Sequence, residues 1–98
     1  MKIEFSKNSG ELNVVLDGRL DTTTAPELEK FLNENCDFAG NLTINCEKLA
    51  YVSSAGLRVL LATQKKMQKI GSMKVTNVCE AVMEVLEMTG FADILVIE

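Results

Sequence analysis

The sequence contains no histidine, and this absence excludes several kinds of enzyme. Without an imidazole there is no Ser-His-Asp or Cys-His nucleophile pair, no histidine-ligated zinc site and no usual general base near neutral pH. Phosphate-binding loops are also missing, because neither G-x-x-x-x-G-K-[ST] nor G-x-G-x-x-G occurs and the six glycines are dispersed. We therefore expect a protein that is not an enzyme and has no metal or cofactor.

Cysteines are few, and none forms the C-x-x-C pair of zinc and thioredoxin-like sites. We interpret Cys36, Cys46 and Cys79 as reduced, buried thiols in a cytosolic chain, since free cysteine is among the most buried residue types. Long apolar runs are missing too, and the first residues alternate apolar and polar side chains, which disfavours secretion and membrane spanning. A cytoplasmic location is expected.

Length and composition predict one folded domain over residues 1–98. Apolar residues make up 47% of the 98 residues and charged residues 24%, which is close to the average for globular proteins. Ten Lys and Arg against fourteen Asp and Glu give a net charge of −4, and the acidic residues are spread along the chain. A nucleic-acid partner is therefore not expected.

Alternation of apolar and polar side chains predicts strands near residues 3–5, 12–16 and 42–46. The turn signal at residues 7–10 makes the first two strands a hairpin. A helix is predicted to begin near Thr24, whose side chain can cap it, with a proline in its first turn.

The second half of the chain shows two further helix starts. One helix should begin near Ser53 or Ser54, carry lysines in its last turn and end at Gly71. After a short strand at residues 73–75, Asn77 with a glutamate three residues later indicates the start of another helix.

The apolar run 94–97 is predicted to close the chain as a buried strand. Strands and helices thus alternate along most of the chain, and strand-helix-strand units require crossovers that favour parallel pairing. The predicted fold class is α/β, with a mixed, mostly parallel sheet that has an N-terminal hairpin and is covered by about three main helices.

A pair of serines, Ser53 and Ser54, lies where a predicted strand passes into a predicted helix. On one interpretation a serine merely caps the helix, while Ala55 and Gly56 allow close packing. On the other, an exposed hydroxyl is available for modification, and a phosphate would add about −1.5 to −2 charge units. Only half of a nucleophile elbow is present, which does not support a hydrolase.

Three segments in this order, GRLDTTTA at 18–25, YVSSAGL at 51–57 and VLEMTG at 85–90, resemble the STAS domain of bacterial anti-sigma factor antagonists. The resemblance extends over nearly the whole chain and implies a single STAS domain. In that family the middle motif typically reads Asp-Ser-Ser/Thr-Gly-Leu. The serine after the aspartate is phosphorylated by a partner that is both anti-sigma factor and serine kinase.

The resemblance implies a role for particular residues of this chain. Ser54 corresponds to the phosphoacceptor, and Ser53 replaces the aspartate and becomes an alternative acceptor. Asp21 corresponds to the acidic residue of the first motif, although the residues alone favour a solvated turn carboxylate there and a solvated Arg58. The implied partner-binding surface comprises Asp21, Thr22, Thr23, Ser53, Ser54, Ala55, Gly56, Leu57 and Arg58.

The resemblance also implies a function. The unphosphorylated form would bind the anti-sigma factor/serine kinase and free the sigma factor, phosphorylation of Ser54 would release the partner, and a serine phosphatase would reset the cycle. Such a protein regulates sigma-factor-dependent transcription, and we expect it to be a monomer when free. The alternative is a STAS scaffold, or a transporter- or lipid-trafficking-associated module that binds without phosphorylation, which the serine at position 53 favours.

Overall fold

The computed structural model describes residues 1–35 and 40–98, whose strands form one sheet. The strands are β1 (Lys2–Asn8), β2 (Glu11–Leu20), β3 (Asn41–Val52) and β4 (Ser72–Thr76), in the order β1-β2-β3-β4. The β1–β2 pair is antiparallel and the other two pairs are parallel. The mixed, mostly parallel sheet with an N-terminal hairpin is therefore confirmed.

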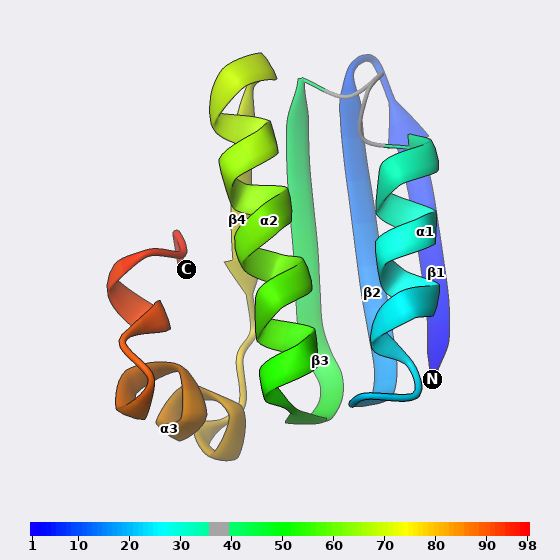
Figure 1. Ribbon diagram of the computed structural model, residues 1–98. Coiled ribbons are helices and arrows are strands. Elements are labelled where there is room, and N and C mark those ends of the chain that lie inside the picture. The colour runs from blue at the N-terminus through cyan, green and yellow to red at the C-terminus, as the bar shows by residue number, and fades with distance from the viewer. Residues whose placement is uncertain (36–39) are drawn as a thin grey trace.

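The helices are α1 (Ala25–Asn35), α2 (Ser54–Ile70) and α3 (Glu80–Met88), followed by the short 3-10 helix η2 (Phe91–Asp93). Figure 1 shows α1 and α2 side by side over one face of the sheet, with α3 and the C-terminal segment beyond β4. Within the described ranges, no helix is long and apolar enough to cross a membrane.

The core lies mainly between the sheet and the two helices α1 and α2, and Val82 and Leu86 of α3 belong to the same cluster. Alternate residues of β2 and β3 point into it, because successive side chains of a strand face opposite sides of the sheet. The buried strand residues include Leu12, Val14, Leu16, Leu42, Ile44 and Cys46, and the helices add Leu28, Leu32, Leu57, Leu60 and Met67. Each fully buried Leu or Ile contributes about 1.5–3 kcal/mol of transfer free energy.

The hairpin turn consists of two residues, Ser9 and Gly10, between the paired residues Asn8 and Glu11. Both turn residues have positive φ, 43° at Ser9 and 84° at Gly10. Two central residues with positive φ are typical of the turn whose twist matches that of antiparallel strands. The turn predicted at residues 7–10 is confirmed.

Gly71 closes α2 as predicted, because two backbone segments approach each other there. Its N–H donates to the carbonyl of Met67 at 2.7 Å, and a Cβ at position 71 would lie 1.7 Å from the carbonyl oxygen of Gly40. The same oxygen accepts a hydrogen bond from the N–H of Ser72 at 2.9 Å. Position 71 therefore has room for glycine only, because any Cβ would collide with the backbone of Gly40.

The prediction that residues 94–97 form a buried strand was wrong. Ile94 and Val96 are 45% and 50% exposed, and the segment meets β4 only through an isolated parallel bridge between Val75 and Ile97. Backbone hydrogen bonds link the N–H of Val75 to the carbonyl of Val96 and the N–H of Glu98 to the carbonyl of Val75. The 3-10 helix η2 directs the chain to this single point of contact.

Two predicted helix caps also differ in the structure. The hydroxyl of Thr24 bonds backwards to Asp21 and Arg19 instead of to a helix N–H. Asn77 has a φ of 55°, its side-chain amide donates to the Oδ1 of Asn45 at 3.2 Å, and the N-cap of α3 is Cys79 without a side-chain bond. In both cases the polar side chain has a closer partner outside the helix.

The described cysteines are free thiols. Cys46 is buried, and this burial, with a smaller contribution from Cys79, raises the pKa of its thiol to about 12. Cys79 is half-buried, and its sulfur lies 3.6 Å from the carbonyl oxygen of Leu49, to which it donates. Both are free thiols, but the predicted burial is confirmed only for Cys46, because Cys79 is half-buried; Cys36 lies outside the described residues.

Candidate functional site

The carboxyl ends of β2 and β3 bring two of the three sequence motifs together. Leu20 and Val52 are partners at the end of the parallel register, and the N–H of Ser53 donates to the carbonyl of Leu20 at 2.8 Å. The first motif continues into the loop before α1, and the second continues into α2. Figure 1 shows both connections at the lower end of the sheet.

Gly56 allows the first turn of α2 to pack directly on the end of β2. A Cβ at position 56 would lie 2.6 Å from Cγ and 3.1 Å from the carbonyl oxygen of Leu20. Any larger residue would displace the helix or Leu20. The close packing suggested by the sequence is therefore present, and it fixes the start of α2 against the end of β2.

The loop after β2 is held by hydrogen bonds among its own residues. Oδ1 of Asp21 accepts from the backbone N–H groups of Thr23 and Thr24, at 3.0 and 3.1 Å. The hydroxyl of Thr24 accepts from the N–H of Asp21 and donates to the carbonyl of Arg19, both at 2.8 Å. The hydrogen bond from the Thr24 N–H is the main reason why the pKa of Asp21 is lower than its usual value. The loop therefore presents a fixed carboxylate.

The two serines of the second motif have different surroundings. Ser53 is the half-buried N-cap of α2, and its Oγ accepts from the N–H of Gly56 at 3.4 Å. Ser54 is the first residue of the helix, and its side chain is exposed, with no hydrogen bond to the described part of the chain. The two interpretations of the serine pair therefore apply to different residues: Ser53 caps, and Ser54 presents a hydroxyl.

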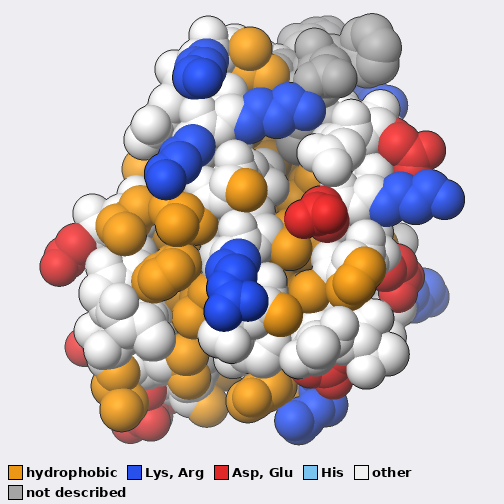
Figure 2. Space-filling model, viewed as in Figure 1, with side chains coloured by type: hydrophobic (Ala, Val, Ile, Leu, Met, Phe, Trp, Pro, Cys, Tyr) orange, Lys and Arg blue, Asp and Glu red, His pale blue; other side chains and the backbone are white. Residues whose placement is uncertain are grey.

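A hollow of about 460 Å³ lies between α1 and α2 next to this end of the sheet. Thr22 and Ala55 line it, together with the exposed side chains of Glu29 and Arg58. Arg58 lies four residues after Ser54, so the two residues are neighbours on one face of α2. Figure 2 shows this face of the molecule, with hydrophobic side chains at the surface and several Lys and Arg side chains over α2.

An aromatic and a cationic side chain pair at the same end of the sheet. Arg19 and Tyr51 are partners in the β2–β3 register, and Cζ of Arg19 lies 4.4 Å from the centre of the Tyr51 ring. Tyr51 is 38% exposed. The pair was not expected from the sequence, because only the register of two distant strands places the residues opposite each other. Exposed Tyr and Arg side chains are the types most enriched at binding hot spots.

A family model for the STAS domain matches residues 2–98. The chain belongs to the STAS domain family. It is 29% identical over 96 residues to an anti-sigma-B factor antagonist of Bacillus subtilis (strain 168), covering 97% of this chain and 88% of the relative. It is 28% identical over 97 residues to an anti-sigma-B factor antagonist of Staphylococcus aureus (strain NCTC 8325 / PS 47), covering 97% and 90%.

Solved structures agree with this assignment. An anti-sigma factor antagonist from Mycobacterium paratuberculosis superposes with a TM-score of 0.87 at 25% identity, covering 98% of this chain and 83% of that one. The anti-sigma factor antagonist SpoIIAA in its unphosphorylated form gives a TM-score of 0.84 at 15% identity, covering 99% and 88%. The latter likeness supports the STAS fold alone.

The residues proposed for partner binding fall into two groups in this STAS domain. Asp21, Thr22, Thr23, Ser53, Ser54, Ala55 and Arg58 are exposed or half-buried at one end of the sheet. Gly56 is buried and Leu57 is 3% exposed in the core, so these two position α2 instead of lining a surface. Within residues 1–35 and 40–98, no cluster of His, Cys, Asp and Glu side chains could hold a metal ion.

Proposed function

We propose that this STAS domain is an anti-sigma factor antagonist of the cytoplasm whose binding is switched at Ser54. In the unphosphorylated state it binds an anti-sigma factor that is also a serine kinase, and a sigma factor is freed for transcription. Phosphorylation of Ser54 by that partner ends the complex, and a serine phosphatase restores the binding form. The names of the relatives support the antagonist role, and the exposed hydroxyl of Ser54 supports the switch.

The different surroundings of the two serines favour Ser54 as the phosphoacceptor. A kinase must reach the hydroxyl oxygen, and Ser54 offers an exposed one with no intramolecular partner among the described residues. Ser53 is only half-buried, not exposed, and its oxygen already accepts a hydrogen bond from the N–H of Gly56, so a kinase reaches it less easily. Ser53 is therefore the less suitable of the two acceptors.

The fold can accept a phosphate on Ser54 without rearrangement. Ser54 is at the N-terminus of a helix of 17 residues, where free N–H groups and the helix dipole favour an anion. Arg58, one turn later and exposed, supplies a cation on the same face. The phosphorylated domain should therefore remain folded.

The partner complex would not tolerate the same phosphate. A dianion on the docking surface adds charge that must be desolvated or paired when the partner binds. A hundredfold loss of affinity requires only about 2.7 kcal/mol, which the desolvation of one phosphate at the interface can supply. The switch thus acts on the interface and leaves the domain unchanged.

Ser53 keeps one property of the aspartate typical of the family and lacks another. Both residue types are favoured N-caps, and Ser53 does cap α2. The negative charge next to the phosphoacceptor is missing, so the cognate kinase must recognise a site with one charge fewer.

Intact-mass analysis with site mapping tests the proposal. The protein is incubated with ATP, magnesium and a candidate anti-sigma kinase from the same genome, beside Ser54→Ala and Ser53→Asp variants. One added phosphate on the wild type and on Ser53→Asp, but none on Ser54→Ala, is expected. Phosphate retained on Ser54→Ala would assign the acceptor to Ser53. No phosphate with any such kinase, together with partner capture in a pull-down, would favour the second candidate, a constitutive STAS binding module.

A further inference from the structure

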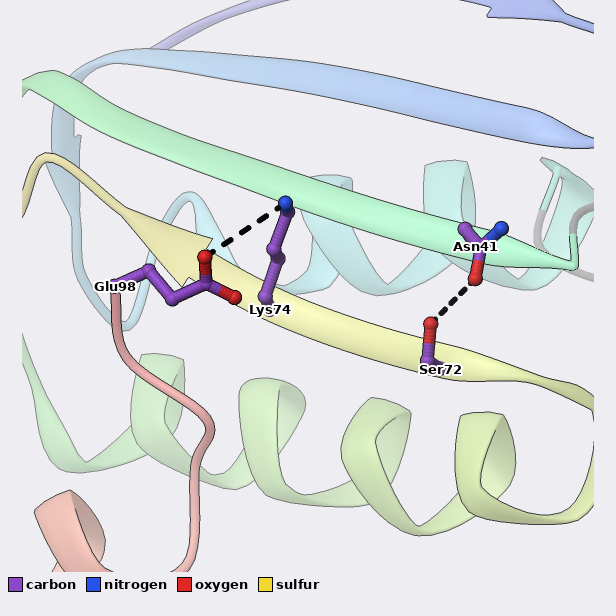
Figure 3. Close-up of polar contacts among 4 residues, drawn as sticks. All are labelled: Asn41, Ser72, Lys74 and Glu98. Atoms are coloured by element: carbon purple, nitrogen blue, oxygen red, sulfur yellow. Dashed lines mark hydrogen bonds and ion pairs between the residues drawn. The ribbon is translucent and has the colours of Figure 1, made fainter.

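The two edges of the sheet differ in how they are covered. At the β4 edge, Val75 exchanges backbone hydrogen bonds with the C-terminal segment, and Nζ of Lys74 lies 3.9 Å from a carboxylate oxygen of Glu98. Figure 3 shows Glu98 reaching over β4 to this lysine. β1 is the other edge strand, and no strand of the described ranges pairs with its outer side. An uncovered edge is a template for a further strand.

The hairpin determines which backbone groups of β1 point outwards. Residues that flank a two-residue turn form a hydrogen-bonded pair, and here these are Asn8 and Glu11. Hydrogen-bonded and non-hydrogen-bonded pairs alternate along an antiparallel ladder. Ile3, Phe5 and Lys7 therefore direct their N–H and C=O groups away from β2, towards the free edge.

An exposed aromatic side chain lies at the centre of this edge. Phe5 is 53% exposed, and its ring centre lies 4.9 Å from that of Phe31 on α1. Half-buried Met1 and Ile3 extend this apolar surface, and with Phe31 they line a hollow of about 540 Å³ whose rim carries charged residues of both signs, Lys2, Glu27, Lys30 and Glu34. Free backbone groups and apolar side chains thus coincide on β1.

We propose that a second copy of this chain pairs antiparallel with β1 about a two-fold axis at Phe5. Phe5 would lie opposite Phe5, Ile3 opposite Lys7, and Lys2 opposite Asn8. This register pairs all seven residues of the strand and brings the outward backbone groups into about six hydrogen bonds. It places no like charges directly opposite each other, whereas a shift by two residues sets Glu4 against Glu4.

The same copy would also cover the apolar side chains. Phe5 and Phe31 of one chain would meet the same residues of the other, and aromatic cross-strand pairs are favourable. Each Glu4 already has Nζ of Lys2 at 3.7 Å, which lessens the repulsion between the two chains. One strand pair is a small interface, so the association is of the weak, reversible class. The monomer expected from the sequence is then the dilute form.

The dimer would leave the docking surface free. β1 is separated from β3, which leads into Ser53 and Ser54, by β2. Both copies would therefore present their Ser54 hydroxyls, and the association does not depend on the proposed switch.

Sedimentation velocity of the whole chain between about 10 µM and 1 mM, the range of weak interfaces, tests the proposal. The mass should rise from 10.8 kDa towards twice that value. Phe5→Glu, which sets two carboxylates opposite each other, should weaken association by about tenfold or more, and Phe5→Leu should weaken it less. Lys7→Pro removes an outward N–H and leaves the hydrogen bonds between β1 and β2 intact. It should weaken association, whereas Lys7→Ala should not.

Amide hydrogen exchange supplies an independent readout. The outward amides of Ile3, Phe5 and Lys7 should gain protection as concentration rises, while far-UV circular dichroism shows each variant folded. A single 10.8 kDa species up to about 1 mM would overturn the proposal. A dimer that persists in both Phe5→Glu and Lys7→Pro, or amides of β1 that gain no protection, would overturn it as well.

Discussion

Gly56 approaches Leu20 so closely that a methyl group at position 56 would lie 2.6 Å from Cγ of Leu20. Leu20 also anchors the residue before the helix, since its carbonyl accepts a hydrogen bond from the N–H of Ser53. The start of α2 is therefore fixed on the end of β2, and with it the placement of Ser54 relative to the Asp21 loop. The geometry of the proposed switch depends on this contact.

Gly56→Ala should destabilise the domain, by up to about 2 kcal/mol. Overpacking costs about 1–3 kcal/mol, and alanine offsets about 1 kcal/mol of this cost through its higher helix propensity. Urea unfolding measures the difference, and Ala62→Gly at an exposed position of α2 reports helix propensity alone. A Gly56→Ala variant more stable than the wild type by the full propensity difference measured at position 62 would show that the contact imposes no constraint.

Ser53→Ala should destabilise the domain, while Ser53→Asp should not. Removal of an N-cap oxygen costs about 0.5–2 kcal/mol, and the bond from the N–H of Gly56 is long at 3.4 Å, which suggests the lower end. Aspartate supplies an equivalent oxygen and a favourable charge at the helix N-terminus. Chemical denaturation of both variants decides the matter. A Ser53→Ala variant as stable as the wild type would mean that the Ser53 side chain does not cap α2.

Tyr51→Ala should weaken binding of the anti-sigma partner by about tenfold or more, as expected of an aromatic hot spot. The ring is 38% exposed and packs under Arg19, so the substitution removes contact area and frees the guanidinium. Tyr51→Phe keeps the ring and serves as the control in the same titration. If Tyr51→Ala binds like the wild type, the Arg19–Tyr51 pair lies outside the docking surface.

Asp21 should make stability depend on pH in the acid range. Its pKa is lowered in the folded state, mainly by the hydrogen bond from the Thr24 N–H. A lowered folded-state pKa contributes stability above the unfolded pKa, and this contribution is lost as pH falls through the folded pKa. Asp21→Asn keeps an acceptor oxygen but does not titrate, so it should lose less stability between about pH 5 and pH 2. Parallel pH profiles of the two proteins, measured by urea unfolding, would contradict this role.

Much of the fold could be predicted from the sequence because its signals are local. Alternation along β2 and β3 and the glycine after α2 reflect burial and close approach within short segments. The run 94–97 was mispredicted because four apolar residues fit a strand as well as a loop segment that packs only part of its side chains. Asn77 was mispredicted as a cap because its partner, Asn45, lies on another strand.

The site was predictable to a different extent at each residue. Resemblance to the STAS family pointed to Asp21 and Ser54, and the structure places both at the same end of the sheet. A shift of one residue in the start of α2 would exchange the capping serine for the exposed one. Sequence patterns rarely fix a helix start to a single residue. The Arg19–Tyr51 pair depends on the register between β2 and β3, which includes two irregularities just before it.

The proposed switch is tested by the affinity of the anti-sigma partner for the protein with and without a phosphate on Ser54. Calorimetric titration with the wild type, the homogeneous Ser54-phosphorylated protein and Ser54→Asp should show tight binding only for the first. We expect a loss of about hundredfold on phosphorylation and a partial loss for Ser54→Asp, with unchanged circular dichroism. Equal affinity of the phosphorylated and unphosphorylated proteins would contradict it.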